Sequence, residues 1–525
     1  MTHRFSQNCV QTRNSLANTR LALVPFLAVV ILSVALVSLA QTPAIARGPG
    51  QPVSERANSA AGQKPLQFAK VVDYPSGGLT VSSVAVADLN GDGHLDLVVG
   101  NACTSRWGCD PYEPDLGAVG VLLGKGDGTF QATVSYSSGG YVSSAIAVGD
   151  LNGDGHPDLV IANECQNVYC TIGGISVLLG NGDGTFQPAV NYDWNENAPA
   201  SIAIADVNGD GYPDVIVGDG CPTDICTGGA VGIFLGNGDG TFQPAITYST
   251  GGSYAAMAIG DLNGDGKPDL AMAIDTNTVA VMLGNGDGTF QSPVDYGSGG
   301  SAADWVTIGD VNGDGKPDLL VANGGGTVGV LLGNGDGTFQ PAMSYSAGSA
   351  LAIAIGDLNG DGHPDLAVAD LGLVVLLGNG DGTFQNPIGF KTGGIGGDCV
   401  AVADLNKDGR PDIVVGNWGS DSVGVLLNNL SAKTTTVVTS SLNPSQVGES
   451  VTFTATITSI SSIPDGSTVT FYEGKNEIGT ATTTNGVASM TTSFSEPKTY
   501  VIVAKYAGDA FHKASLGKVK QVVNQ

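Results

Sequence analysis

The stretch Asp150-Leu-Asn152-Gly-Asp154-Gly-His156-Pro-Asp158 places five oxygen donors within nine residues. Six near copies occur elsewhere in the chain, beginning at Asp88, Asp206, Asp261, Asp310, Asp357 and Asp404. Each keeps Asp at loop position one, Asn at three, Asp at five, Gly at six and Asp at nine. A hard dication such as Ca²⁺ prefers roughly six to eight oxygen ligands at about 2.4 Å. The loops therefore predict up to seven Ca²⁺ sites, one in each repeat.

The predicted ligands are the side chains at positions one, three, five and nine and the main-chain carbonyl at position seven. Position seven varies between His, Tyr, Lys and Arg, and a cationic head group would repel a metal ion, so only the main chain can be the shared ligand there. The full set is Asp88, Asn90, Asp92, His94, Asp96, Asp150, Asn152, Asp154, His156, Asp158, Asp206, Asn208, Asp210, Tyr212, Asp214, Asp261, Asn263, Asp265, Lys267, Asp269, Asp310, Asn312, Asp314, Lys316, Asp318, Asp357, Asn359, Asp361, His363, Asp365, Asp404, Asn406, Asp408, Arg410 and Asp412. The alternative is a tight Asx and Gly turn without an ion, although such a turn does not need three crowded carboxylates.

Composition separates this chain from several classes of protein. The 525 residues include 79 Gly and few aromatics, which favours many short strands and turns. The formal net charge is −28, and the seven loops account for 21 of the 49 acidic residues. No basic stripe is available to neutralise phosphates, so nucleic acid is excluded as a partner.

Six of the eight cysteines fall into close pairs, each flanking a short polar insertion. The pairs are Cys103 with Cys109, Cys165 with Cys170, and Cys221 with Cys226. In an exported chain we expect three local disulfides, with three pairs of free thiols as the alternative. Cys9 lies in the leader, and Cys399 is left over and expected to be buried.

The N-terminus has the features of an export signal. Residues 1–20 are polar with three Arg, and 21–40 form a nearly unbroken apolar run that ends in small residues. We interpret 1–40 as a signal peptide, with an uncleaved membrane anchor as the alternative because the run is long enough to span a bilayer. Residues 41–64, rich in Pro, Ala, Gly and Ser, are interpreted as a linker.

Residues 65–430 repeat a unit of 47 to 62 residues, a period typical of solenoids and propellers. One unit predicts four strands, for example 145–148, 159–162 and 175–179, followed by a Gly-Asn-Gly-Asp-Gly turn and a fourth strand. That fourth strand carries a Phe and an aromatic six residues later, as in Phe130 and Tyr136. Phe68 and Tyr74 have the same spacing but precede the first loop, whereas no such strand follows the seventh loop. The offset predicts a closed ring, a seven-bladed β-propeller whose last sheet is completed by the N-terminal strand.

The repeat resembles the FG-GAP/VCBS family, related to the seven-bladed propeller of integrin α subunits. That resemblance implies an Asp-rich, Ca²⁺-binding loop between the two inner strands of each blade. The chain lacks the Phe-Gly and Gly-Ala-Pro motifs that give the family its name and has Gly-Asn-Gly-Asp-Gly-Thr-Phe in their place. The resemblance therefore does not imply integrin partners. The Asp residues of those turns are interpreted as hairpin residues, with ion contact as the alternative: Asp127, Asp183, Asp239, Asp287, Asp336 and Asp381.

Residues 431–525 show Thr, Val and Ser alternation in 451–458, 467–472, 487–492 and 500–506. This alternation predicts a β-sandwich of about 90 residues. It resembles bacterial Ig-like repeat domains, with Val-Thr-Phe-Tyr at 469–472 and Tyr-Ala-Gly-Asp at 506–509. We therefore expect an all-β chain: a seven-bladed β-propeller followed by an Ig-like β-sandwich.

Successive hairpins of a blade alternate between its edges, so the metal loops and the Gly-rich turns should share one face. The opposite face should carry the three insertions and a set of aromatics: Trp107, Tyr112, Tyr169, Trp194, Trp305 and Trp418. Exposed aromatics on stiffened loops favour a ligand face for sugars or protein. The alternative is that these rings fill the channel or pack blade on blade.

These patterns predict a secreted or cell-surface, non-catalytic binding or adhesion protein with an extracellular carbohydrate or protein ligand. We expect a monomer, with membrane contact only if the leader is uncleaved. No His pairs with a Ser or Cys nucleophile in a recognisable arrangement, so no catalytic residue is assigned. One alternative is a carbohydrate-active lyase or glycosidase on the insertion face, using for example Asp110, Glu113 or Asp115. The second alternative is a structural envelope component.

Overall fold

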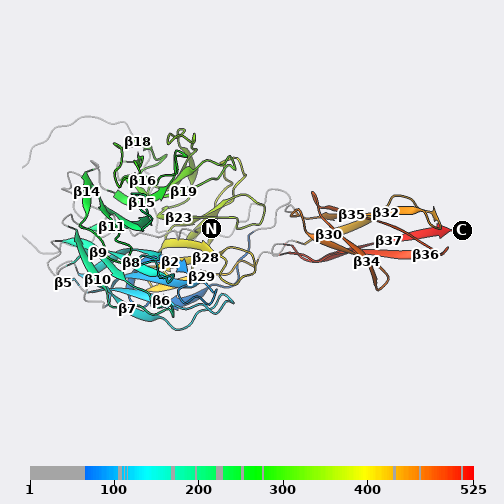
Figure 1. Ribbon diagram of the computed structural model, residues 1–525, viewed down its shortest axis with the longest axis horizontal. Coiled ribbons are helices and arrows are strands. Elements are labelled where there is room, and N and C mark those ends of the chain that lie inside the picture. Colours follow the sequence, from blue (N-terminus) through cyan, green and yellow to red (C-terminus); the bar gives the residue numbers. More distant parts are fainter. Residues whose placement is uncertain are drawn as a thin grey trace, which may run out of the picture.

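The computed structural model describes residues 66–104, 109–110, 113–114, 116–166, 172–194, 198–219, 229–249, 254–274, 277–429, 433–459, 463–509 and 512–525. All regular elements within these ranges are β-strands, labelled in Figure 1, which confirms the all-β prediction. Within the same ranges no helix is long and apolar enough to cross a membrane. The predicted signal peptide 1–40 and linker 41–64 lie outside the described residues.

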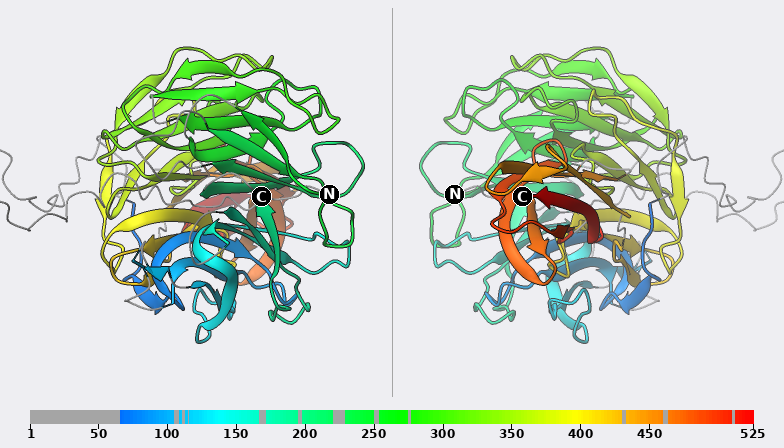
Figure 2. Two further views of the ribbon diagram at one scale, coloured as in Figure 1. Left: turned by 90° about the vertical axis from the view of Figure 1, so that its left-hand side faces the viewer. Right: turned by 90° about the vertical axis from the view of Figure 1, so that its right-hand side faces the viewer.

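Antiparallel four-stranded sheets repeat along the larger domain. Four of them are built from consecutive strands: β11 (Pro199–Ala205), β12 (Asp214–Asp219), β13 (Ala230–Phe234) and β14 (Ile246–Ser249); β15 (Tyr254–Gly260), β16 (Asp269–Ile274), β17 (Thr278–Met282) and β18 (Val294–Gly297); β19 (Ala303–Gly309), β20 (Asp318–Asn323), β21 (Thr327–Leu331) and β22 (Met343–Ser346); β23 (Ala352–Gly356), β24 (Asp365–Ala369), β25 (Leu373–Leu376) and β26 (Ile388–Phe390). These sheets are the blades of a β-propeller, arranged around an axis in Figure 2.

The first part of the domain forms one seven-stranded sheet. It contains β2 (Leu79–Ala87), β3 (Asp96–Cys103), β6 (Leu116–Leu122), β7 (Val134–Gly149), β8 (Asp158–Cys165), β9 (Gly173–Leu178) and β10 (Val190–Trp194). Strand β7 pairs with β6 through its first part and with β8 through its second. If β7 is divided near Gly139, whose φ is 88°, two further blades result. The count of seven blades stays a prediction. A short hairpin of β4 (Cys109–Asp110) and β5 (Glu113–Pro114) lies in the insertion between β3 and β6.

The two ends of the domain meet in one sheet. Strand β1 (Val72–Pro75) pairs with β29 (Ser422–Leu426), which pairs with β28 (Asp412–Asn417) and then β27 (Gly397–Ala403). Phe68 extends this pairing through a bridge to Asn428. Strand β2, blue in Figure 2, packs beside β27 and β28, in yellow. The predicted closure by an N-terminal strand is therefore confirmed, and it leaves no blade edge open at the junction.

Aromatic pairs lie between neighbouring blades. An aromatic ring of each outer strand, Tyr in six blades and Phe390 in one, meets the Phe of the next blade edge to face, with ring centroids 5.1 to 6.4 Å apart. The pairs are Tyr74 with Phe130, Tyr136 with Phe186, Tyr192 with Phe242, Tyr248 with Phe290, Tyr296 with Phe339, Tyr345 with Phe384, and Phe390 with Phe68. Such contacts add about 0.5–1.5 kcal/mol each beyond area burial. The repeated Phe and Tyr spacing in the sequence thus serves contacts between blades.

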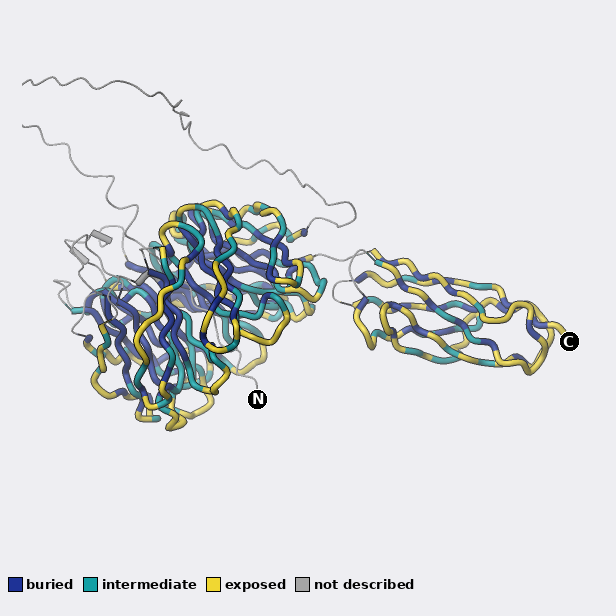
Figure 3. The backbone as a smooth tube through the Cα atoms, turned by 90° about the horizontal axis from the view of Figure 1, so that it is seen from above, coloured by how far each residue is buried: buried dark blue, intermediate teal, exposed yellow. Residues whose placement is uncertain are grey.

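Burial falls from the inner strands outward, as Figure 3 shows. Every residue of β28 is buried, whereas the outer strand β18 is mostly exposed. An inner strand covered on both faces needs apolar residues at successive positions, which explains why these strands are nearly continuous apolar runs. The propeller core therefore lies between the blades.

The C-terminal domain is a β-sandwich of two sheets. One contains β30 (Thr435–Ser440), β32 (Ser450–Thr458) and β35 (Val487–Ser493); the other contains β31 (Ser445–Gln446), β37 (Ser515–Asn524), β36 (Thr499–Tyr506), β33 (Thr468–Glu473) and β34 (Asn476–Thr482). Phe453, Phe471, Ile502 and Tyr506 are buried between them. Alternating buried and exposed residues along β32 and β36 match the predicted sandwich.

The cysteine predictions are only partly within the described residues. Cys399 is free and buried, as expected. Cys103 and Cys165 are buried and are disulfide-bonded. The side chains of their predicted partners, Cys109 and Cys170, lie outside the described residues, as do Cys221 and Cys226. The three pairings stay predictions.

Candidate metal loops and the opposite face

Each Asp-rich loop joins the first and second strands of a blade and is folded by its own side chains. In the loop between β7 and β8, Asp150 Oδ1 accepts a hydrogen bond from the Gly153 amide at 2.8 Å, and its Oδ2 accepts one from the Gly155 amide at 2.9 Å. Asn152 Oδ1 accepts from the Asp154 amide at 3.0 Å. Asx turns of this kind explain why Asp, Asn and Gly recur at these positions.

The position-nine carboxylates have a role that sequence reasoning missed. Asp158 is fully buried; its Oδ2 accepts from the Leu151 amide at 2.9 Å and its Oδ1 from the Gly180 amide at 2.7 Å. Gly180 begins the turn between the third and fourth strands, so one side chain joins two hairpins. Equivalent bonds to both hairpins recur at Asp96, Asp214, Asp269, Asp318 and Asp365, and at Asp412 the second bond comes from the Asn428 amide instead of a turn. Part of the Asp signature is therefore structural.

The electrostatics of the loops favour a cation. Burial raises the pKa of Asp158, and the nearby carboxylates of Asp154 and Asp150 raise it further. Burial likewise raises the pKa of Asp365 to about 8 and of Asp412 to about 7. A dication in the loop would offset both the repulsion among its three carboxylates and the cost of burying the one at position nine.

The side-chain oxygens of the loops are of the kind that Ca²⁺ prefers. In this structure they accept hydrogen bonds from main-chain amides. Among the described residues, no three acidic, His or Cys side chains converge into a metal centre. A carboxylate oxygen has more than one lone pair, so an oxygen that accepts an amide hydrogen bond can also face an ion. The residues at positions one, three, five, seven and nine would hold the ion. Calcium at these loops stays a prediction.

In six of the seven loops the side chain at position seven lies against the neighbouring Gly-rich turn, and Arg410 is the exception. His156 lies over the second glycine of the neighbouring turn, so that a β-carbon at Gly182 would stand 2.4 Å from His156 Cε1. The same contact pairs His94 with Gly126, Tyr212 with Gly238, Lys267 with Gly286, Lys316 with Gly335, and His363 with Gly380. Metal loops and Gly-rich turns thus lie side by side, which confirms that they share one face.

This contact gives a prediction for the glycine turn. Gly182→Ala should destabilise the propeller by roughly 2–3 kcal/mol, because the methyl group would meet His156 and because Gly182 has a φ of 76°. Gly155→Ala is the matched control: its φ is 85° but nothing lies within 4 Å of its β-carbon position, so about 1 kcal/mol is expected. Urea unfolding of both variants measures the difference, and equal losses would contradict the contact.

The turn aspartates act as hairpin residues. Asp183 Oδ1 accepts from the Thr185 amide at 2.9 Å and from the Thr185 hydroxyl at 2.5 Å. These bonds lower the pKa of Asp183, the hydroxyl contributing most. The same pair of bonds forms at Asp127, Asp239, Asp287, Asp336 and Asp381. The observed geometry matches the turn interpretation.

The predicted aromatic ligand face is wrong at two of its six residues. Trp194 is buried, packs on Gly232 and donates from Nε1 to Thr247 Oγ1 at 3.1 Å. Trp305 is also buried, in the first strand of its blade. Both rings fill space between strands, the alternative considered for them. Trp107, Tyr112 and Tyr169 lie outside the described residues.

Trp418 is exposed, and two apolar residues that sequence reasoning missed lie near it. Trp418 is 39% exposed, Ile395 69% and Leu371 51%. The Trp418 amide donates to Gly396 O at 3.0 Å, and the next amide donates to Ile395 O at 2.9 Å. Leu371 precedes Gly372, and the carbonyl carbon of Gly372 lies 3.1 Å from the position of a β-carbon on Gly397. The preceding residue, Gly396, lies against the Trp418 ring, so the link that carries Leu371 runs beside this group. An apolar residue inside a Gly-rich link, as at Ile395, was the sequence signal available.

Together these features define a β-propeller whose blades carry an Asp-rich loop between their first two strands. The FG-GAP-like repeat matches residues 112–161, 167–217, 223–272, 261–321, 310–368 and 357–415, and the FG-GAP repeat matches 80–102. The chain belongs to the FG-GAP repeat family. Residues 438–524 match the bacterial Ig-like domain (group 3).

Several curated proteins are similar to part of the repeat region. The chain is 35% identical over 146 residues to phosphatidylinositol-glycan-specific phospholipase D of Homo sapiens, covering 25% of this chain and 17% of that protein. It is 32% identical over 149 residues to integrin alpha-IIb of Mus musculus, covering 26% and 14%. It is 30% identical over 222 residues to integrin alpha pat-2 of Caenorhabditis briggsae, covering 36% and 17%. The chain spans less than a fifth of the length of each.

The similarity to integrin alpha-IIb covers 14% of that protein, so a binding or adhesion role belongs to the proposal below. The integrin relatives and the bacterial Ig-like domain indicate an extracellular or surface protein. The phospholipase similarity is partial, so the activity of that relative is not transferred to this chain.

Proposed function

We propose that this chain is an exported, Ca²⁺-stabilised propeller that binds an extracellular carbohydrate or protein without catalysis. The family supports a binding role, and the Asp-rich loops supply a donor set suited to calcium. Residues 438–524, which match the bacterial Ig-like domain, would form a separate module beside the propeller. We expect the protein to be secreted or held at the cell surface.

Calcium would act as a scaffold. When bound, the ion supplies positive charge among three carboxylates and cross-links the hairpin between the two inner strands. The chain's own residues position that hairpin: Asx turns fold the loop, and Asp158 ties it to the turn at Gly180. Three disulfides at the predicted pairs would stiffen the insertions in the same way.

The exposed group of Trp418, Ile395 and Leu371 is the observation that carries the binding proposal. Trp418 follows β28 at the end away from its metal loop, so this group lies on the face opposite the calcium loops. An exposed indole offers a flat apolar surface with a polar N–H, which suits stacking on a sugar ring or packing on a protein side chain. Under this proposal, metal-dependent folding and ligand contact would use separate faces of the propeller.

A screen of extracellular glycans and matrix proteins against the full chain tests this proposal. For any ligand found, Trp418→Ala should weaken binding by about tenfold or more, because a buried aromatic contact typically contributes at least about 1.4 kcal/mol. Val294→Ala is the matched control, since Val294 is an equally apolar, exposed residue on the outer strand β18. Surface plasmon resonance gives both dissociation constants. A dissociation constant that is unchanged by Trp418→Ala would count against this face as the binding site. A screen that finds no ligand would also count against it.

A further inference from the structure

The seventh loop, Asp404–Asp412, differs from the other six in two positions. Position four is Gly in six loops and Lys407 here, and position seven is Arg410. Two cations within one loop occur only in this copy. Three Asp with one Lys and one Arg give this loop a formal charge of −1, the same value that three Asp and a dication would give.

The backbone of this loop also departs from the repeat. In the other six loops the position-four amide donates to the position-one carboxylate at 2.7–2.8 Å. The corresponding bond from Lys407 to Asp404 is missing in the described seventh loop, where Asp404 Oδ1 accepts only from the Asp408 amide at 3.1 Å. Lys407 has a φ of 58°, a left-handed conformation that favours glycine. Lys407 therefore adopts a backbone conformation that is unfavourable for a residue with a side chain.

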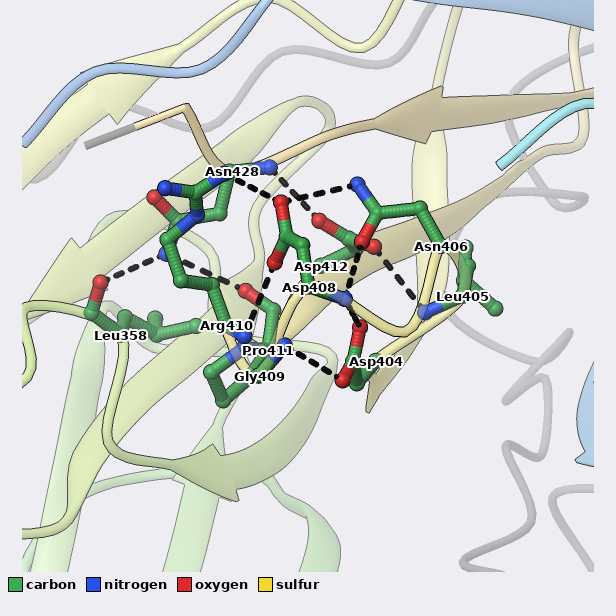
Figure 4. A network of polar contacts seen from close by, with 10 residues as sticks. All are labelled: Leu358, Asp404, Leu405, Asn406, Asp408, Gly409, Arg410, Pro411, Asp412 and Asn428. Atoms are coloured by element: carbon green, nitrogen blue, oxygen red, sulfur yellow. Dashed lines mark hydrogen bonds and ion pairs between the residues drawn. The ribbon is translucent and has the colours of Figure 1, made fainter. Parts of the chain in front are cut away.

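The guanidinium of Arg410 turns into its own loop. Arg410 Nη2 forms an ion pair with Asp408 Oδ2, the oxygen that also accepts from Asn406 Nδ2 at 3.1 Å (Figure 4). The two side chains are 18% and 26% exposed, whereas the Lys267 and Asp265 pair in the fourth loop is 3.7 Å long and 44% and 39% exposed. Arg410 therefore shields a position-five carboxylate that a metal ion would need.

Ring closure explains why only this loop behaves so. In the other blades the position-seven side chain lies on a glycine of the following turn, but the seventh loop has no such turn because its fourth strand comes from the N-terminus. Asn428 stands in for the turn: its amide donates to Asp412 Oδ1 at 2.7 Å, and its Nδ2 donates to Leu358 O at 2.7 Å (Figure 4). Without the glycine surface, Arg410 folds back over Asp408.

Lys407 lies at the contact between the last blade and the first. Its ammonium lies 3.4 Å from the position of a β-carbon on Gly93, in the first loop. The first and last blades meet here, as β2 packs beside β27 and β28. Positive charge from the seventh loop is thus placed against the acidic first loop across the closing contact.

We propose that Arg410 takes the place of Ca²⁺ in the seventh loop, with Lys407 offsetting charge at the adjoining first loop, so that the propeller takes up six calcium ions and its closing blade holds none. This rests on the proposed calcium scaffold. The residues of the other six loops suit Ca²⁺, whereas in this loop the Arg410 guanidinium already pairs with the Asp408 carboxylate. The closing contact would then keep its charge balance when calcium is scarce.

Counting bound Ca²⁺ tests the inference. Equilibrium dialysis of the full chain against calcium, with metal analysis of the protein, should give six ions per chain. The double variant Lys407→Gly, Arg410→His restores residue types found in the other loops and should bind one more ion. Lys70→His with Lys391→Gly removes the same two charges at exposed sites outside the loops and should leave the count at six.

The outcomes separate this inference from the calcium scaffold itself. Seven ions on the unmodified chain, or equal nonzero counts with and without the double variant, would overturn the inference and leave the scaffold standing. No bound calcium in either protein would overturn both. Because the double variant uses residues that fold in other blades, its melting in calcium should stay within a few degrees of the parent, and this measurement checks that it is folded.

Discussion

Removing calcium should lower the melting temperature of the propeller on the order of 10 °C and leave the sandwich unaffected. Extracellular calcium modules bind with dissociation constants of about 10⁻⁴ to 10⁻³ M. At about 10 mM calcium each filled site then adds roughly 1.4–2.7 kcal/mol, or on the order of 10 kcal/mol over the set. An unfolding entropy of about 2.1 cal/mol/K per residue converts this into the stated shift for a domain of this size.

Differential scanning calorimetry of the full chain with calcium and with chelator measures the effect. The sandwich contains no copy of the loop and has its own core around Phe453 and Phe471, so its transition is the internal control. Magnesium at the same concentration should protect much less, because it demands a smaller, near-octahedral site. A propeller transition that is the same in calcium and in chelator would contradict the scaffold role.

Asp158→Ala should destabilise the propeller by about 3 kcal/mol even when calcium is absent. The substitution leaves the buried amides of Leu151 and Gly180 without their acceptor, at roughly 1–3 kcal/mol each. Relief of the repulsion from Asp154 and Asp150 offsets part of that loss. Urea unfolding in the presence of chelator isolates this structural role from any effect on metal binding.

Two variants make the comparison specific. Asp158→Asn keeps one acceptor oxygen and should cost about 1–2 kcal/mol. Asp154→Ala removes an exposed carboxylate of the same loop and should change stability in chelator by less than about 1 kcal/mol, while still weakening calcium binding. If Asp158→Ala loses no more stability in chelator than Asp154→Ala does, the bonds from Leu151 and Gly180 to Asp158 do not carry the structural role assigned to them.

Most of the fold follows from local patterns in the sequence. The loop recurs seven times, and the Phe and Tyr spacing marks the outer strand of each unit. The offset between these two series predicts the strand that closes the ring, and β1 pairing with β29 confirms it. These signals are readable because Asx turns, glycine turns and strand periodicity depend on residues only a few positions apart.

The candidate sites were harder to predict, since burial depends on neighbouring blades. Trp194 and Trp305 resemble exposed loop aromatics in sequence but are buried, because strands from elsewhere in the chain cover them. Ile395 lies in a Gly-rich link without any periodic signal, and its exposure beside Trp418 is a property of the folded surface.

The sequence by itself determined the repeat, the closing strand, the sandwich and the oxygen-rich loops, because each is written in contiguous residues. Only the tertiary structure decided what those residues do once the blades meet. Asp158 joins hairpins through Gly180, 22 positions away, and the Arg410 guanidinium bends into its loop because ring closure removes the turn that other blades provide. Hydrogen-bond partners and burial are set by contacts between distant segments, which local sequence patterns do not specify.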